Sequence, residues 1–156
     1  MGFLPIFIAV GGFIFLWVTL VYNGIKASKK DLNTISSHIR QLNTERHELI
    51  MEIGKREPKL SEQLSAIRKT VNMESLEEPL KSWEQQERHI QEQQIRMIEI
   101  DGFSEETEEM VTELAARGRK VRELVGRYYS GIRSYNRLIM KPPHRYLAGP
   151  LGFQPI

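Results

Sequence analysis

The sequence predicts an all-α protein in which a single N-terminal transmembrane helix continues into an antiparallel four-helix bundle with coiled-coil-like packing. Three observations predict this fold. An almost unbroken apolar run covers Phe3 to Tyr22, the polar chain after it repeats apolar residues at three- and four-residue spacings, and Gly and Pro interrupt these repeats. We therefore expect a transmembrane anchor at 1–24, a cytoplasmic helical bundle at 25–140, and a Pro/Gly-punctuated tail near the membrane at 141–156.

The apolar run is long enough to cross a bilayer once. Its sequence, FLPIFIAVGGFIFLWVTLVY, has no charged residue, and roughly 20 helical residues span about 30 Å, one hydrocarbon core. Trp17 and Tyr22 lie near its C-terminal end, where amphipathic rings favour the headgroup region. The alternative is a cleaved signal peptide, but no Lys or Arg precedes the run and no small-residue cleavage pattern follows it.

Charge and composition indicate the compartment and narrow the function. Lys26, Lys29, Lys30 and Arg40 follow the apolar run, so the positive-inside rule places the N-terminus outside and the bulk of the chain in the cytoplasm. A net charge of +2 with 27% charged residues indicates neither nucleic acid nor a strongly acidic partner. The absence of Cys excludes disulfides, thiolate catalysis and Cys-ligated zinc.

Apolar stripes predict four helices. The first helix continues beyond the membrane segment, and Arg46 occupies one position of its apolar stripe. This helix ends at Gly54 and Glu57-Pro58. The second helix is short. The third begins at Pro79, and its apolar stripe is sparse because the polar residues Glu87 and Gln94 occupy stripe positions between the apolar ones. The apolar positions of these three helices are Leu32, Ile35, Ile39, Leu42, Leu49 and Ile53, then Leu60, Leu64, Ile67 and Val71, then Leu80, Trp83, Ile90 and Met97.

The fourth helix has the most regular stripe. Asp101-Gly102 interrupts the chain, Ser104 is the expected N-cap, acidic residues occupy the first turns and basic residues the middle, as the helix dipole favours. Its stripe is Val111, Leu114, Gly118, Val121, Val125, Tyr128, Ile132, Tyr135 and Ile139. A helix of about 55 Å would match the roughly 50 Å of the first helix beyond the membrane, so we expect the two to pair along their full length.

Short connections make successive helices antiparallel, so the end of the fourth helix should return to the membrane. There the chain places basic residues before an apolar tail, which we interpret as an interfacial foot that contacts headgroups and lipid; a loose chain end is the alternative. The expected membrane-interface residues are Trp17, Tyr22, Lys26, Lys29, Lys30, Lys141, Arg145 and Phe153.

The second and third helices, at about 21 and 33 Å, are too short to cover both long stripes. We therefore expect exposed apolar surface on the membrane-proximal parts of the first and fourth helices, and such surface usually marks an interface. The expected interface with a second copy or a partner protein consists of Leu32, Ile35, Ile39, Tyr128, Ile132, Tyr135 and Ile139. Tyr129 points away from the stripe, and packing explains it less well than it explains Tyr128 and Tyr135.

Motifs at both ends of the chain resemble the LemA family. Tyr22-Asn23-Gly24-Ile25, the basic spacer to Leu32, and Arg46-His47-Glu48-Leu49-Ile50 are similar to the opening of that family. Tyr128, Tyr135-Asn136, Ile139, Pro143 and the segment LAGPLGF at 147–153 are similar to its closing pattern. The chain departs from the family in shorter central helices and at Ile35-Ser36, Met51-Glu52 and Tyr129. The resemblance implies a bacterial inner-membrane protein with a short outside N-terminus, a cytoplasmic four-helix bundle and no established enzymatic activity.

Catalytic and metal-binding patterns are absent from the sequence. The residues three before His38, His47, His89 and His144 are not Glu, so the Glu-x-x-His pairs of di-iron bundles are missing, as are His-x-x-x-His pairs and phosphate-binding glycine loops. We therefore expect that the protein is not an enzyme and binds no cofactor. We also expect the Trp83 side chain to lie in the core. The expected function is a membrane-bound scaffold that assembles with itself and presents a surface to partner proteins. The alternatives are an envelope coiled-coil tether in the opposite orientation and a metal-dependent bundle enzyme.

Overall fold

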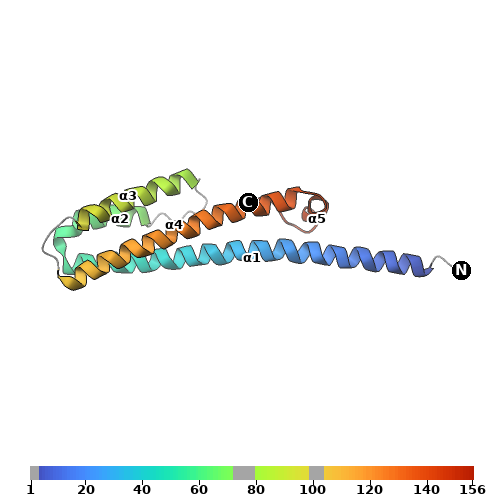
Figure 1. The fold of residues 1–156 in the computed structure, drawn as a ribbon, viewed down its shortest axis with the longest axis horizontal. Helices are drawn as coiled ribbons and strands as arrows, with labels where there is room; N and C mark the ends of the chain where they lie inside the picture. The colour runs from blue at the N-terminus through green and yellow to red at the C-terminus, as the bar shows by residue number, and fades with distance from the viewer. Residues whose placement is uncertain (1–3, 72–79, 99–103) are drawn as a thin grey trace. The chain divides into compact units, whose positions relative to one another are not determined.

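The computed structural model describes residues 4–71, 80–98 and 104–156, and within them every regular element is a helix. The all-α prediction is therefore confirmed. The elements are α1 (Leu4–Arg56), the 3-10 turn η1 (Pro58–Leu60), α2 (Ser61–Val71), α3 (Leu80–Ile98), α4 (Glu105–Met140) and α5 (His144–Ala148) (Figure 1). The expected helix start at Pro79 and the Asp101-Gly102 break lie outside the described residues, as do the side chains of Val71, Leu80 and Trp83.

Helix ends fall where local sequence signals place them. α1 ends at Arg56, Glu57 takes a non-helical conformation (φ −126°, ψ 84°), and Pro58 opens η1. At the start of α4 the Ser104 hydroxyl accepts a hydrogen bond from the Thr107 amide at 3.3 Å, as an N-cap should. The predicted stop of the first helix and the predicted cap of the last are both confirmed.

The N-terminal part of α1 is the one described helix segment that is long and apolar enough to cross a membrane. Its most apolar window has a mean hydropathy of 2.0, and only 6% of that window is buried. The exposed side chains surround the helix on all sides rather than forming one stripe. They include Ile6, Phe7, Ile8, Val10, Phe13, Ile14, Phe15, Leu16 and Leu20.

The chain divides into two compact units. Unit 1 comprises Met1–Thr34 and Ser130–Ile156, and unit 2 comprises Ile35–Tyr129. This division places the boundaries inside α1 and α4, and it joins the C-terminal tail to the apolar segment in one unit. The expected division into 1–24, 25–140 and 141–156 is based on the composition of the sequence. The division into two units is based instead on which residues contact one another.

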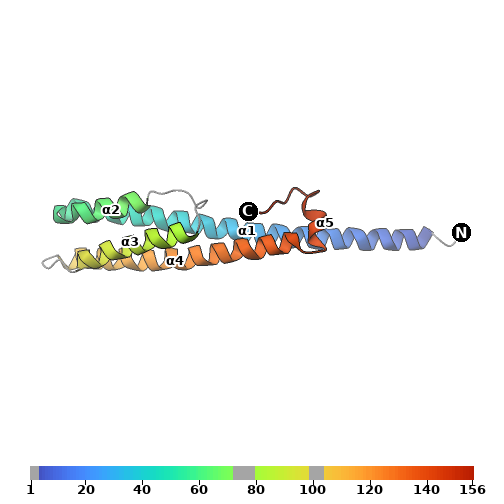
Figure 2. The ribbon, with the colours of Figure 1, turned by 90° about the horizontal axis from the view of Figure 1, so that it is seen from above.

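Unit 2 has a core to which all of its helices contribute. Both views show α2 and α3 beside the adjoining stretches of α1 and α4 (Figure 1, Figure 2). The main cluster of buried residues is Ile50, Ile53, Leu60, Leu64, Ile67, Ile90, Met97, Val111 and Leu114. A second cluster joins Ile39 of α1 to Val121 and Val125 of α4. The buried positions of α4 keep the three- and four-residue spacing of its predicted stripe.

Unit 1 is held by direct packing of α1 on α4. Leu32 is buried, and its Cδ2 atom would lie 2.7 Å from a Cβ added at Gly131, which is closer than carbon atoms approach. Gly131 therefore allows the two helices to come together at this point. Tyr135 and Ile139 of α4 and Val21 and Ile25 of α1 are buried as well.

The expectation of exposed apolar surface on these helices is wrong at four of the seven positions. Leu32, Ile39, Tyr135 and Ile139 are all at most 4% exposed within a single chain. The physical reason is that the facing stretches of α1 and α4 cover each other inside each unit, so the short helices are not needed there. Ile35, Tyr128 and Ile132 are half-buried, and an interface through them stays a prediction.

Candidate functional site

Three residues of the expected membrane interface come together in unit 1. The Tyr22 and Phe153 rings lie with their centroids 5.8 Å apart at an interplanar angle of 54°. Lys26, one helical turn beyond Tyr22, places its Nζ atom 5.6 Å from the Tyr22 ring centroid. The sequence placed Tyr22 and Lys26 at the end of the apolar run, and the structure adds Phe153 from the far end of the chain.

The C-terminal tail, residues 141–156, follows a defined path back to α4. After α5 the amides of Leu151, Gly152 and Phe153 donate hydrogen bonds to backbone carbonyls within the tail. Gly152 has a φ of +76°, a left-handed conformation that suits glycine. The Asn136 side chain then donates to the Ile156 carbonyl oxygen at 2.9 Å and accepts from the Ile156 amide at 3.0 Å. These contacts bring Phe153 and Ile156 back onto α1 and α4 of unit 1.

The remaining members of the expected membrane interface are spread over the surface of unit 1. Lys29, Lys30, Lys141 and Arg145 are exposed, and Trp17 is half-buried. The structure therefore gathers Tyr22, Lys26 and Phe153, and it leaves the other five expected residues apart from this contact.

The interior of unit 2 contains a polar cluster that sequence reasoning did not assemble. Arg46 of α1 is 1% exposed and donates from Nη1 to Glu87 Oε1 of α3 at 2.8 Å, with Nη2 3.5 Å from Oε2. Gln94 of α3 is buried about two helical turns further along. A Cβ added at Gly118 of α4 would lie 3.6 Å from Arg46 Nη2 and 3.8 Å from Gln94 Nε2. We call these four residues the interior polar cluster.

The interior polar cluster is only partly satisfied. Arg46 Nη1 also donates to Asn43 Oδ1 at 3.3 Å, but Arg46 Nε and Gln94 Nε2 are buried without a hydrogen-bond partner among the described residues. A buried ion pair of this kind adds little net stability, yet it strongly penalises any arrangement that separates its two members. The signal was present in the sequence, because Arg46, Glu87 and Gln94 each occupy a stripe position that an apolar residue would normally fill.

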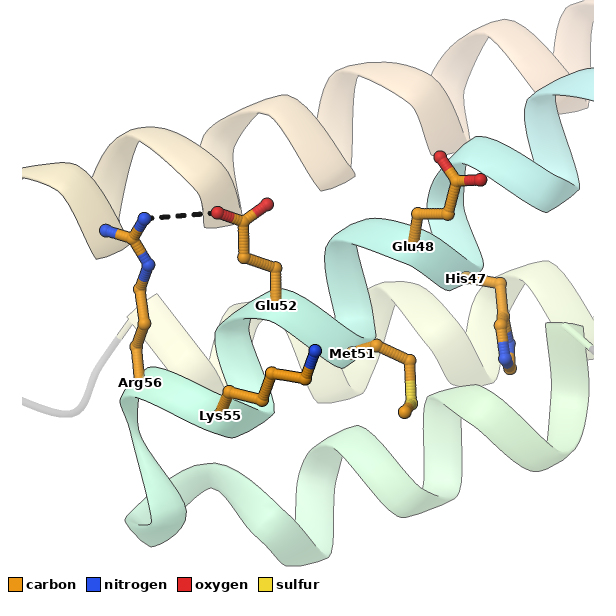
Figure 3. Close-up of a pocket in the computed structure, with 6 residues that line it drawn as sticks. All are labelled: His47, Glu48, Met51, Glu52, Lys55 and Arg56. Carbon is orange, nitrogen blue, oxygen red and sulfur yellow. Dashed lines mark hydrogen bonds and ion pairs between the residues drawn. The ribbon is translucent and has the colours of Figure 1, made fainter.

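A shallow cavity of about 550 Å³ lies on the outer face of α1 in unit 2. Figure 3 shows Glu52 and Arg56 on one side, joined by an ion pair of 3.1 Å, and Met51 and His47 on the other. Arg56 also pairs with Glu106 of α4. The lining residues are His47, Glu48, Met51, Glu52, Lys55 and Arg56.

The side chains of this cavity do not form a catalytic arrangement. All six come from one helix, two of the charges neutralise each other, and His47 Nδ1 is buried without a hydrogen-bond partner in the described part of the chain. A general base needs a nucleophile or substrate proton within hydrogen-bond reach, and no such neighbour of His47 is found among the described residues. Across residues 4–71, 80–98 and 104–156, no group of three or more His, Asp or Glu side chains is arranged to hold a metal ion.

The tyrosines have structural surroundings. Tyr128 and Tyr129 both pack against the cluster of Ile39, Val121 and Val125, and their rings meet edge-on with centroids 5.8 Å apart. Packing therefore accounts for Tyr129 as well, because a residue beside the stripe still reaches this apolar cluster. Burial raises the pKa of the Tyr135 phenol above its usual range, and its hydroxyl has no hydrogen-bond partner among the described residues.

Comparison of the chain with protein-family models, with curated proteins and with solved structures finds no match.

Proposed function

We propose that the chain is a non-enzymatic, membrane-anchored helical scaffold with one transmembrane helix and a cytoplasmic four-helix bundle. The observation that carries the proposal is the N-terminal part of α1, which is apolar and exposed on all sides. A helix that is hydrophobic all round requires an apolar surrounding, and the described residues of this chain do not provide one. A lipid bilayer provides it over the whole length of the segment.

Two further observations support the body of this proposal. The main core of unit 2 draws on α1, α2, α3 and α4, as an antiparallel four-helix bundle requires. The motifs that resemble the LemA family support the same architecture in a bacterial inner membrane, with the N-terminus outside and the bulk in the cytoplasm. Membership of that family is part of the proposal.

Self-assembly is the second part of the proposal. Ile35, Tyr128 and Ile132 remain half-buried in the single chain and keep apolar surface available on α1 and α4. We propose that Ile35 and Tyr128 of unit 2, and Ile132 of unit 1, each contact a second copy or a partner protein. Fewer apolar positions are available than the sequence predicted, because α1 and α4 already cover the other four positions.

Membrane integration and orientation are tested together in bacterial cells. Because the chain has no Cys, Gly2→Cys and Ser134→Cys each introduce a single thiol, and each variant is the control for the other. We expect the full chain to resist alkaline extraction from membranes, and a membrane-impermeant maleimide to label only the Gly2→Cys variant in intact cells. Release by alkali would contradict the anchor. Labelling of only the Ser134→Cys variant would instead favour the oppositely oriented tether.

Self-assembly is tested by the mass of the full-length protein in mild detergent. We expect a defined oligomer that Ile132→Glu dissociates, because the substitution places a charge in an apolar contact. Ser134→Glu, at an exposed position two residues away, should leave the mass unchanged. A monomeric wild-type protein would overturn the self-assembly part and leave the anchor untouched.

A further inference from the structure

The two units carry opposite charge. Unit 1 contains seven Lys and Arg residues and one acidic residue, Asp31, which gives it a net charge of +6, whereas unit 2 contains 15 Lys and Arg and 19 Asp and Glu residues, a net charge of −4. The near-neutral composition of the whole chain hides this difference. The positive unit is the one that contains the apolar segment, so the net charge next to the proposed bilayer is positive.

The cations of unit 1 are not used to hold the protein together. Among the described residues, ion pairs with carboxylates occur only within unit 2, where Arg46, Arg56, Arg117 and Arg127 all have acidic partners. In unit 1, Lys26 lies over the Tyr22 ring, and the exposed side chains of Lys29, Lys30, Lys141 and Arg145 have no carboxylate partner in the described part of the chain. These charges are therefore available to an external anion.

Exposed apolar side chains stand beside these cations. Met140 is 60% exposed and Tyr146 is 70% exposed, and they flank Lys141 and Arg145. The Tyr22–Phe153 contact holds the tail against α1 at the end of the apolar run. Basic residues mixed with exposed apolar and aromatic residues at the end of a membrane helix are typical of a surface that lies in the headgroup layer.

We propose that the tail and the adjoining basic turns of α1 form a foot that binds anionic phospholipid headgroups at the bilayer surface. The proposal rests on the membrane anchor proposed above. Lys141 and Arg145 bind the phosphates, Met140 and Tyr146 enter the headgroup layer, and the Asn136–Ile156 hydrogen bonds and the Tyr22–Phe153 contact keep the foot in place.

The test uses the full chain in nanodiscs that contain either phosphatidylcholine alone or phosphatidylcholine mixed with phosphatidylglycerol. Gln154→Cys, at an exposed tail position, carries an environment-sensitive dye, and spin-labelled lipids report its depth. Retention of a fluorescent phosphatidylglycerol by delipidated protein reports affinity. We expect deeper insertion and tighter retention with phosphatidylglycerol than with phosphatidylcholine, and a difference that shrinks as salt is added.

The decisive variant is Lys141→Gln with Arg145→Gln. Each juxtamembrane cation contributes about a fivefold preference for anionic lipid, so the double variant should retain phosphatidylglycerol on the order of 25-fold less tightly. The matched control is Arg119→Gln with Lys120→Gln, two exposed cations in the part of α4 that belongs to unit 2; it should behave as wild type. Far-ultraviolet circular dichroism checks that both variants keep their helices.

The outcomes separate the foot from the anchor. If the tail variant and its control show the same lipid preference, and both still resist alkaline extraction, the proposal of a foot is wrong. The proposed function is then unaffected. Equal tail insertion in neutral and anionic nanodiscs overturns the role of charge as well. Extraction of the wild-type protein by alkali is a failure of the anchor itself.

Discussion

Units 1 and 2 use the same two helices in different ways. In unit 2, α1 and α4 surround buried charge, and ion pairs such as Arg117–Glu45, at 2.8 Å, link them across the surface. In unit 1 the same helices meet through aliphatic and aromatic side chains, with Gly131 allowing close approach, and the charges point outward. The same two helices therefore make different kinds of contact in the two units.

This difference shows how one repeat pattern can serve two surroundings. The three- and four-residue spacing of apolar residues continues along α4 from one unit into the other, with Tyr128 and Ile132 half-buried, so periodicity alone does not distinguish the units. What differs between the units is whether the charged side chains form ion pairs. In unit 2 several cations form ion pairs with carboxylates, whereas no cation of unit 1 does so among the described residues.

The largest expected effect comes from breaking the interior polar cluster. Arg46→Met leaves Glu87 buried without its partner, so we expect the free energy of unfolding to fall by about 3–5 kcal/mol in a chemical denaturation experiment. Arg46→Met with Glu87→Met should recover most of this loss, because two apolar side chains replace the pair. A control at the surface, Arg117→Met, should cost about 1 kcal/mol or less.

The double variant also tests what the cluster does for the fold. If the buried pair selects the position of α3, the apolar double variant should be as stable as wild type but show broader amide spectra for α3. Sharp, wild-type-like spectra in the double variant would argue against this role, and the pair would then contribute no specificity.

A smaller effect is expected from releasing the tail in unit 1. Asn136→Ala removes two hydrogen bonds to Ile156, each worth about 0.5–1.5 kcal/mol. We expect faster proteolysis within residues 149–156 and an unchanged melting temperature of the helices, because the tail does not contribute to the core of unit 2. A lowered melting temperature of the whole protein would mean that the tail supports more than unit 1. Asn23→Ala, at an exposed position on α1, is the control.

The smallest effect at neutral pH is expected from Tyr135→Phe. The buried hydroxyl lacks a hydrogen-bond partner among the described residues, so its removal should change stability by about 1 kcal/mol or less and toward greater stability. Because the folded-state pKa of Tyr135 is raised above its unfolded value of about 10, the unfolded chain loses its proton first. Wild-type stability is therefore retained below about pH 10 and falls above it, and Tyr135→Phe should make that fall shallower. Identical alkaline profiles for the two proteins would contradict the burial of this phenol.

Much of the fold was predictable because its signals are local. The end of α1 at Arg56 follows from Gly54 and Pro58, and the start of α4 follows from Ser104. The apolar run after Phe3 and the stripe from Val111 to Ile139 are properties of consecutive residues. The polar residues at stripe positions could be recognised in the sequence just as easily, but the residues that they contact could not.

The sequence by itself determined the end of α1, the start of α4 and the one described segment that is apolar enough for a bilayer, because propensity, capping and hydropathy act between near neighbours. The short helix α5 was not expected from the sequence. Only the tertiary structure decided that Arg46 pairs with Glu87, which lies 41 residues away in the chain. It also decided that Leu32 and Tyr135 are covered and that Phe153 returns to Tyr22. These outcomes depend on which helix faces which and at what register, and that choice is made by packing across the whole chain rather than by any local pattern.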